Sequence, residues 1–140
     1  MAAASITLRI VLEQPPPGVA YAVQKGKGAI YDTILKHSAD GGDLTFEFAV
    51  EVRGERGKGE PDFGGPLVQG PRGGRFVYLD VGKYAGQATG AWGGRIKVPL
   101  TGITWRMTQA SVLVAHVPGR GRDGGPSFAT VRDFEGWLPA

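Results

Sequence analysis

The chain has 140 residues, with 16 Lys and Arg against 13 Asp and Glu, and no cysteine. This length is typical of one domain with its own hydrophobic core, and the absence of cysteine excludes disulfide scaffolds, thiolate nucleophiles and thiolate zinc sites. Because acids and bases are interspersed, the formal net charge of +3 does not by itself indicate a nucleic-acid-binding protein.

The sequence contains neither a secretory signal nor an apolar run near the roughly 20 residues that span a bilayer. We therefore expect a cytoplasmic protein with no membrane association. Asparagine is absent and Gly, Ala, Val, Arg and Pro are favoured, which is typical of a bacterial genome rich in G and C. The 24 Gly and 10 Pro predict many tight turns.

In chain order, the first expected element is a half-buried strand over residues 5–13, where apolar and polar residues alternate. A Pro-rich turn ends it, and shorter strands are expected at residues 19–24 and 30–36. The clearest alternation in the chain predicts a long strand over residues 44–53.

Residues 54–74 are rich in Gly and Pro but include Phe63, Leu67 and Val68. These apolar anchors favour an ordered, packed loop over a flexible linker. Core strands are expected on either side of a second Gly-rich loop that carries Tyr84 and Trp92. Their ranges are 75–81 and 95–100.

Two further apolar runs, at residues 103–107 and 111–117, bring the expected strands to seven or eight. The tail from residue 119 ends in spaced apolar residues that fit either a final strand or a helical turn: Phe128, Val131, Phe134 and Trp137. We interpret Trp105 and Trp137 as core residues. The whole pattern predicts a single all-β domain over residues 1–140, an antiparallel sandwich or small closed barrel with long Gly-rich loops.

Short segments along nearly the whole chain are similar to those of a bacterial family of domains of unknown function, numbered 5990. The segments that carry the resemblance are residues 8–12, 16–18, 24–26, 42–46, 65–66, 69–71, 73–78, 97–100, 102–105 and 123–126. The resemblance implies a small bacterial single-domain protein. It implies no activity, cofactor or site residues.

Familiar catalytic motifs find little support. Residues 119–124 match the dinucleotide fingerprint literally, but Pro118 and Pro126 flank them and no helical period follows to receive a pyrophosphate. No serine lies in a nucleophile elbow. His37 and His116 are the sole histidines, and neither has a carboxylate or the other histidine at a metal-ligand spacing. We expect no catalytic residue, no metal and no cofactor.

Cations cluster in several loops, at residues 25–27, 53–58, 72–75 and 120–122. They would form a phosphate-binding rim if the fold brought them together beside loop aromatics. Since no recognised nucleic-acid-binding motif is present, we favour scattered, solubilising charges and expect no nucleic-acid partner.

Loops carry function more often than strands do, so the two long Gly-rich loops are where we place a ligand site. The candidate ligand-binding residues lie in or beside them: Phe63, Gln69, Arg75, Tyr78, Tyr84 and Trp92. For Phe63 and Trp92, plugs that anchor the loops to the core are an equal alternative.

The sequence favours a non-catalytic module that binds a small molecule or a protein, with self-association through an exposed strand edge as one route to a homo-oligomer. A small hydrolase or isomerase with its site in a barrel mouth is the alternative. A weak nucleic-acid-binding domain comes third.

Overall fold

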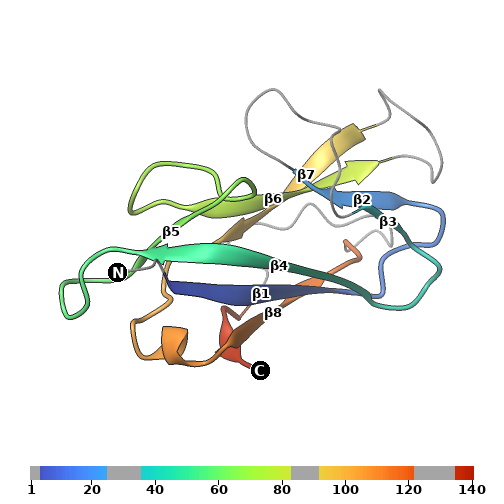
Figure 1. Cartoon of the computed structure of the whole chain (residues 1–140). Coiled ribbons are helices and arrows are strands. Elements are labelled where there is room, and N and C mark those ends of the chain that lie inside the picture. The colour runs from blue at the N-terminus through green and yellow to red at the C-terminus, as the bar shows by residue number, and fades with distance from the viewer. Residues whose placement is uncertain (1–3, 25–35, 83–91, 122–134) are drawn as a thin grey trace.

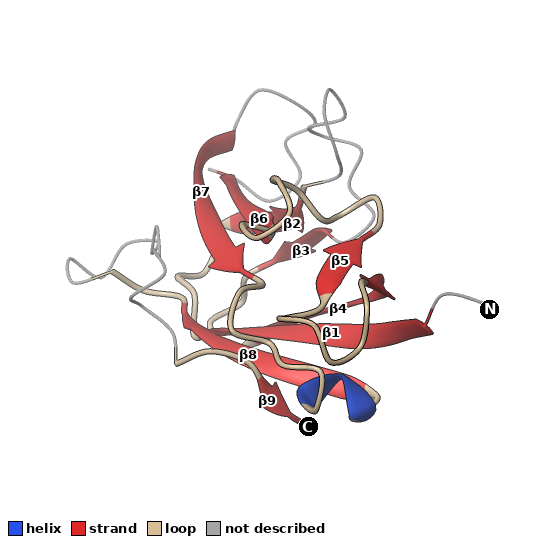
Figure 2. Cartoon of the chain, turned by 90° about the vertical axis from the view of Figure 1, so that its left-hand side faces the viewer, coloured by secondary structure: helices blue, strands red, loops and turns tan. Residues whose placement is uncertain are grey.

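The computed structural model describes residues 4–24, 36–82, 92–121 and 135–140, with the backbone alone for residues 36–38 and 92–94. Within these residues the chain is nearly all β, and its strands form two sheets that lie one over the other (Figures 1 and 2). No helix of the described part of the chain has the length and apolar character needed to cross a membrane.

The larger sheet has five strands in the order β5-β4-β1-β8-β9. Its two long central strands, β1 and β4, run antiparallel over nine paired positions, from Ala4 opposite Val52 to Leu12 opposite Leu44. Its strands are β1 (Ala4–Glu13), β4 (Leu44–Arg53), β5 (Asp62–Gly64), β8 (Val112–Pro118) and β9 (Leu138–Pro139). The alternation predicted for residues 5–13 and 44–53 is confirmed, and its apolar side faces inward.

The smaller sheet has four strands in the order β3-β2-β6-β7. All its pairs are antiparallel, and β7 joins β6 with a register shift between Val81 and Gly82. Its strands are β2 (Ala20–Val23), β3 (Lys36–Ser38), β6 (Phe76–Gly82) and β7 (Trp92–Pro99). Most of the strand expected at residues 30–36 lies outside the described residues. Strand β3 begins at residue 36, which is the last position of that expected strand.

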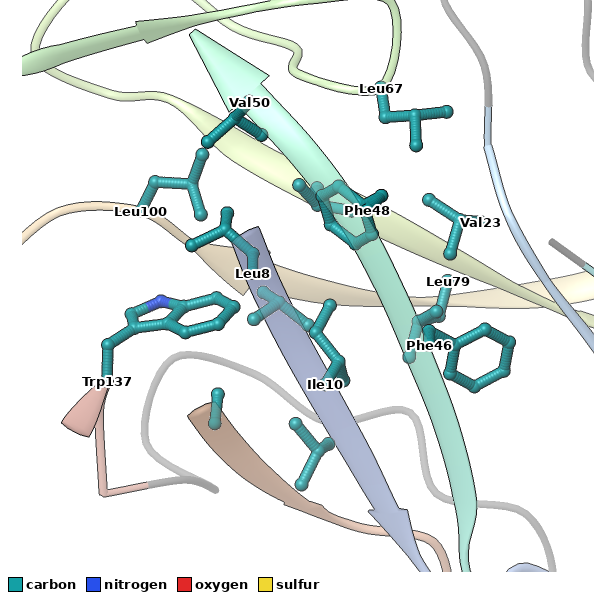
Figure 3. Close-up of a cluster of buried hydrophobic side chains, with 14 of the residues drawn as sticks. Leu8, Ile10, Val23, Phe46, Phe48, Val50, Leu67, Leu79, Leu100 and Trp137 are labelled. Atoms are coloured by element: carbon teal, nitrogen blue, oxygen red, sulfur yellow. The ribbon is translucent and has the colours of Figure 1, made fainter. Parts of the chain in front are cut away.

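The hydrophobic core fills the space between the sheets (Figure 3). Strand β1 contributes Leu8 and Ile10, and β4 contributes Phe46, all with no exposed surface. From the other sheet, Leu79 is likewise fully buried. Side chains that alternate in this way place one face of each sheet in the core, which is what a sandwich requires.

The sandwich differs from the expectation in one pairing. Strand β8 runs parallel to β1, from Thr7 opposite Val112 to Glu13 opposite Pro118, so the larger sheet is mixed rather than antiparallel. A parallel pair needs a long connection, and here nearly a hundred residues separate the two strands. The sheets do not close into a barrel, because β5 and β9 end one sheet and β3 and β7 end the other.

Two loop predictions have different outcomes. Residues 54–74 form an ordered connection in which Phe63 and Leu67 are buried, and it includes the short edge strand β5. The apolar run at 103–107 is not a strand. It forms turns that lead into the 3₁₀ helix η1 (Met107–Gln109), since Gly102 has φ +85° and the Thr104 hydroxyl accepts a hydrogen bond from the Met107 N–H.

The end of the chain packs on the larger sheet. Trp137 is 5% exposed, and its indole N–H donates a hydrogen bond to the Pro99 carbonyl (2.8 Å). Trp105 is partly buried against the core. The other apolar residues of the tail, Phe128, Val131 and Phe134, lie outside the described residues.

Candidate functional site

Residues 69–76 form a tight hairpin at one end of the sandwich. Gln69 and Phe76 exchange two backbone hydrogen bonds (2.9 and 3.0 Å), and the Gly74 N–H bonds the Pro71 carbonyl at the reversal (2.9 Å). Gly70 has φ +89°, and a Cβ there would lie 2.6 Å from the Gly74 carbonyl oxygen. The hairpin therefore requires glycine at this position.

Arg75 fixes this hairpin to edge strand β5. Its guanidinium donates two hydrogen bonds to the Asp62 carboxylate, Nε to Oδ1 (3.0 Å) and Nη2 to Oδ2 (3.3 Å), while Nη1 donates to the Gly70 carbonyl. The hydrogen bond from Arg75 is the main cause of the lowered pKa of Asp62, with the charges of Arg75 and Arg72 adding to it. The pair is partly buried, with 25% of the Arg75 side chain and 11% of the Asp62 side chain exposed.

A cavity of about 320 Å³ opens beside this pair. Phe63 and Leu100, which are 1% and 2% exposed, are its buried apolar lining. Arg72 belongs to the exposed part of its wall and has no hydrogen-bond or ion-pair partner among the described residues. The full lining is Glu60, Pro61, Asp62, Phe63, Arg72, Gly73, Arg75, Leu100 and Thr101.

A second polar group lies on the outer face of the smaller sheet. In an antiparallel ladder, directly opposed residues share a face, so Tyr78 on β6 shares its face with Lys97 on β7, and Gln69 with Phe76. The Gln69 amide donates to the Gln24 side-chain oxygen (2.8 Å). These contacts form a continuous polar and aromatic strip across β2, β6 and β7.

The same face carries a buried carboxylate, Asp80, which is 2% exposed. Its Oδ1 lies 3.3 Å from Nε of Arg95, the residue opposite on β7. Its Oδ2 has no hydrogen-bond partner among the described residues. Burial raises the pKa of Asp80, and the charge of Arg95 partly offsets that rise.

A second cavity, of about 370 Å³, lies on the larger sheet beside β8 and β9. His116, Glu13 and Glu135 line it, and Nδ1 of His116 is 3.6 Å from a Glu13 oxygen. Both side chains of this pair are more than half exposed. In the described part of the chain, no group of three or more His, Asp or Glu side chains is arranged to hold a metal ion.

The structure places four of the six candidate residues, in two different parts of the domain. Phe63 and Arg75 line the cavity beneath the hairpin, while Gln69 and Tyr78 lie on the outer face of the smaller sheet. Trp92 opens β7, without a described side chain, and Tyr84 lies outside the described residues. Whether these residues bind a ligand stays a prediction.

Sequence reasoning missed the partners of these residues. Asp62, Asp80 and Arg95 are not among the residues that the sequence indicates for a ligand site. Arg72 enters only as part of the cation-rich segment 72–75, for which scattered solubilising charge is the favoured interpretation. One signal was available for Asp80, which interrupts the apolar run of residues 76–81 and is therefore an acid in a strand that is otherwise core.

The fold and its cavities define a small two-sheet β-sandwich domain with a charged cavity at one end. Residues 6–140 match the model of the family of unknown function DUF5990, and the chain belongs to that family. No curated protein and no solved structure matches the chain.

Proposed function

We propose that this chain is a non-catalytic module that binds a small ligand in the cavity beneath the 69–76 hairpin, and that the ligand carries a carboxylate or phosphate group. The observation that carries the proposal is the combination of a buried apolar lining with an arginine, Arg72, that has no hydrogen-bond or ion-pair partner among the described residues. Ligand pockets typically combine an apolar lining with a few convergent polar groups, in volumes of roughly 300–1,000 Å³.

The arrangement of the two arginines supports an anionic ligand. Asp62 and the Gly70 carbonyl orient the Arg75 guanidinium, so its remaining donors are held in place before any ligand arrives. Pre-organised donors lose less conformational entropy on binding. Arg72 is exposed beside them, and arginine forms strong charge-assisted hydrogen bonds with carboxylates and phosphates.

Thermal-shift titration tests this proposal. The full chain is screened against small carboxylates, phosphates, neutral sugars and ammonium compounds, since a ligand that binds the native state alone raises the melting temperature. We expect stabilisation by members of the first two classes. Arg72→Gln should remove it without changing the melting temperature of the unliganded protein.

Arg106→Gln is the matched control. Arg106 is exposed, lines neither cavity and makes no side-chain cap bond to η1, so the same change of charge at this position should leave the ligand response intact. If Arg106→Gln reduces the response as much as Arg72→Gln does, the effect is one of net charge and the cavity is not the site.

The residues that line the second cavity support one other candidate function, that of a small hydrolase or isomerase. A histidine beside a carboxylate is a common acid–base pair, and His116 lies beside Glu13 at a cavity that Glu135 also lines. The absence of a closed barrel means that such a site would lie on the sheet surface rather than in a barrel mouth. Hydrolysis of ester substrates that is lost in His116→Gln would support this candidate.

A further inference from the structure

The outer face of the smaller sheet presents two aromatic rings in a row. Phe76 and Tyr78 are two residues apart on β6 and are partly exposed, with ring centroids 4.7 Å apart and planes at 61°. Same-face neighbours on a strand are separated by about 6.6–6.8 Å of chain. Rings at this spacing on a four-stranded sheet are suited to stacking successive bases of a single strand.

Positive charge lies over the faces of these rings. Lys97 and Arg95 project from the neighbouring strand β7, with the Lys97 Nζ 4.4 Å from the centroid of the Phe76 ring and the Arg95 guanidinium 5.0 Å from that of Tyr78. Both cations are exposed, and β7 is the edge strand within the described sheet. Their charge is complementary to that of a phosphate backbone.

Two polar groups on the same face border the rings, and both include buried side chains. Asp80 lies next to Tyr78 on the same face, and its Oδ2 has no partner in the described chain, which leaves a buried acceptor unsatisfied. Because Asp80 is 2% exposed, a base does not reach this carboxylate, and the proposed contacts are limited to the rings and the cations. On the other side of Phe76, the amides of Gln24 and Gln69 are held together by a hydrogen bond.

We propose that this outer face binds single-stranded nucleic acid. The exposed side chains of Lys97 and Arg95 turn from the ring faces to phosphates, and bases stack on Phe76 and Tyr78 in their place. The site goes beyond the ligand cavity proposed above and shares no residue with it. The cations of this site lie on strand β7. The cation clusters noted in the sequence lie in loops, so their dispersal does not argue against nucleic-acid binding at the sheet.

Fluorescence anisotropy of the full chain with a labelled single-stranded oligo(dC) of about 12 nucleotides tests the proposal; sites of this kind span roughly 4–16 nucleotides. We expect binding that weakens steeply between about 50 mM and 200 mM salt. Lys97→Gln should weaken it about tenfold near 100 mM salt and reduce the salt slope by about one. Tyr78→Leu keeps an apolar side chain but removes the ring, and it should weaken binding roughly tenfold or more.

Lys58→Gln is the matched control. Lys58 is 77% exposed, forms a 3.5 Å ion pair with Glu55, and lies outside β6 and β7. It should bind as the parent protein does, and circular dichroism should show that all three variants are folded. The proposal is overturned by the absence of binding at low salt, by equal weakening in Lys58→Gln and Lys97→Gln, or by a duplex of the same length that binds as tightly as the single strand.

Discussion

The Arg75 guanidinium donates two hydrogen bonds to the Asp62 carboxylate and thereby joins the start of β6 to the edge strand β5. Both residues line the cavity, and Arg75 also donates to the Gly70 carbonyl within the hairpin. Because the two residues are 13 positions apart in a Gly-rich connection, the pair restricts a segment that has few other strand contacts. Its strength therefore determines how well the cavity is formed.

A double-mutant cycle measures that strength. Arg75→Met should destabilise the domain by about 1.5–3 kcal/mol, the range for a hydrogen-bonded charged group. Asp62→Asn alone should cost about as much, and the double variant should cost less than the two added together. Urea unfolding checks this. Strict additivity of the two free-energy changes would mean that the pair is not coupled in solution.

Asp80 is a buried acid whose charged form is disfavoured, so its contribution to stability depends on pH. Its folded pKa is raised above the unfolded value of about 3.9. The native state therefore binds more protons between the two values, and stability falls as pH rises through the folded pKa.

At neutral pH we consequently expect Asp80→Asn to be stabilising, by about 1 kcal/mol, because it removes a buried charge whose partner Arg95 is 47% exposed and keeps its solvation. The advantage should shrink as the pH is lowered and the parent carboxyl takes up its proton. Melting curves of the two proteins over a range of pH measure it. An advantage that grows toward acid would contradict the assignment.

Tyr21 carries an unsatisfied hydroxyl inside the core. The residue has no exposed surface, its OH has no hydrogen-bond partner among the described residues, and burial raises its pKa to about 12. Tyr21→Phe removes a group that is costly to bury, so we expect a gain of about 1–2 kcal/mol in unfolding free energy. Tyr78→Phe, at a partly exposed ring, should change stability little. A loss in Tyr21→Phe would show that the hydroxyl has a partner.

Two glycines of the hairpin have similar backbone angles but differ in the space available for a side chain. Gly70 (φ +89°) has no room for a Cβ, which would lie 2.7 Å from the Phe76 ring, whereas Gly73 (φ +87°) has nothing within 4 Å. Gly73→Ala should cost about 1–2 kcal/mol from strain alone. Gly70→Ala should cost about 1–3 kcal/mol more, because a neighbour must move. Chemical denaturation of both variants compares them, and equal costs would exclude the close approach.

Features of the fold that depend on the local sequence can be predicted from it, whereas features that depend on segments far apart in the chain cannot. The alternation of β1 and β4 marks their inward faces, because a half-buried strand needs one apolar side whatever it pairs with. The parallel pairing of β1 with β8 depends on a distant segment and leaves no local signal. The apolar composition of residues 103–107 predicts a strand, and that prediction is wrong because the backbone at Gly102 and the Thr104 hydroxyl favour a turn.

The site was partly predictable for the same reason. Arg75 and Phe63 were identified because they lie in Gly-rich loops. The ion pair that orients Arg75 forms within the 54–75 connection, by a fold of that segment that no spacing in the sequence indicates. The cavity arises where this connection meets Leu100, which is distant in the chain. The structure pairs Asp80 with Arg95 of the neighbouring strand, a contact that depends on strand register.

The most direct test of the ligand cavity is an amide chemical-shift map by two-dimensional NMR, recorded with the carboxylate or phosphate that gives the largest thermal shift. We expect the amide signals of Asp62, Arg72, Gly73 and Thr101 to shift together and to saturate at one dissociation constant, while those of His116 and Leu138 do not shift. Shifts centred on β8 and β9, or no shifts at millimolar ligand, would contradict it.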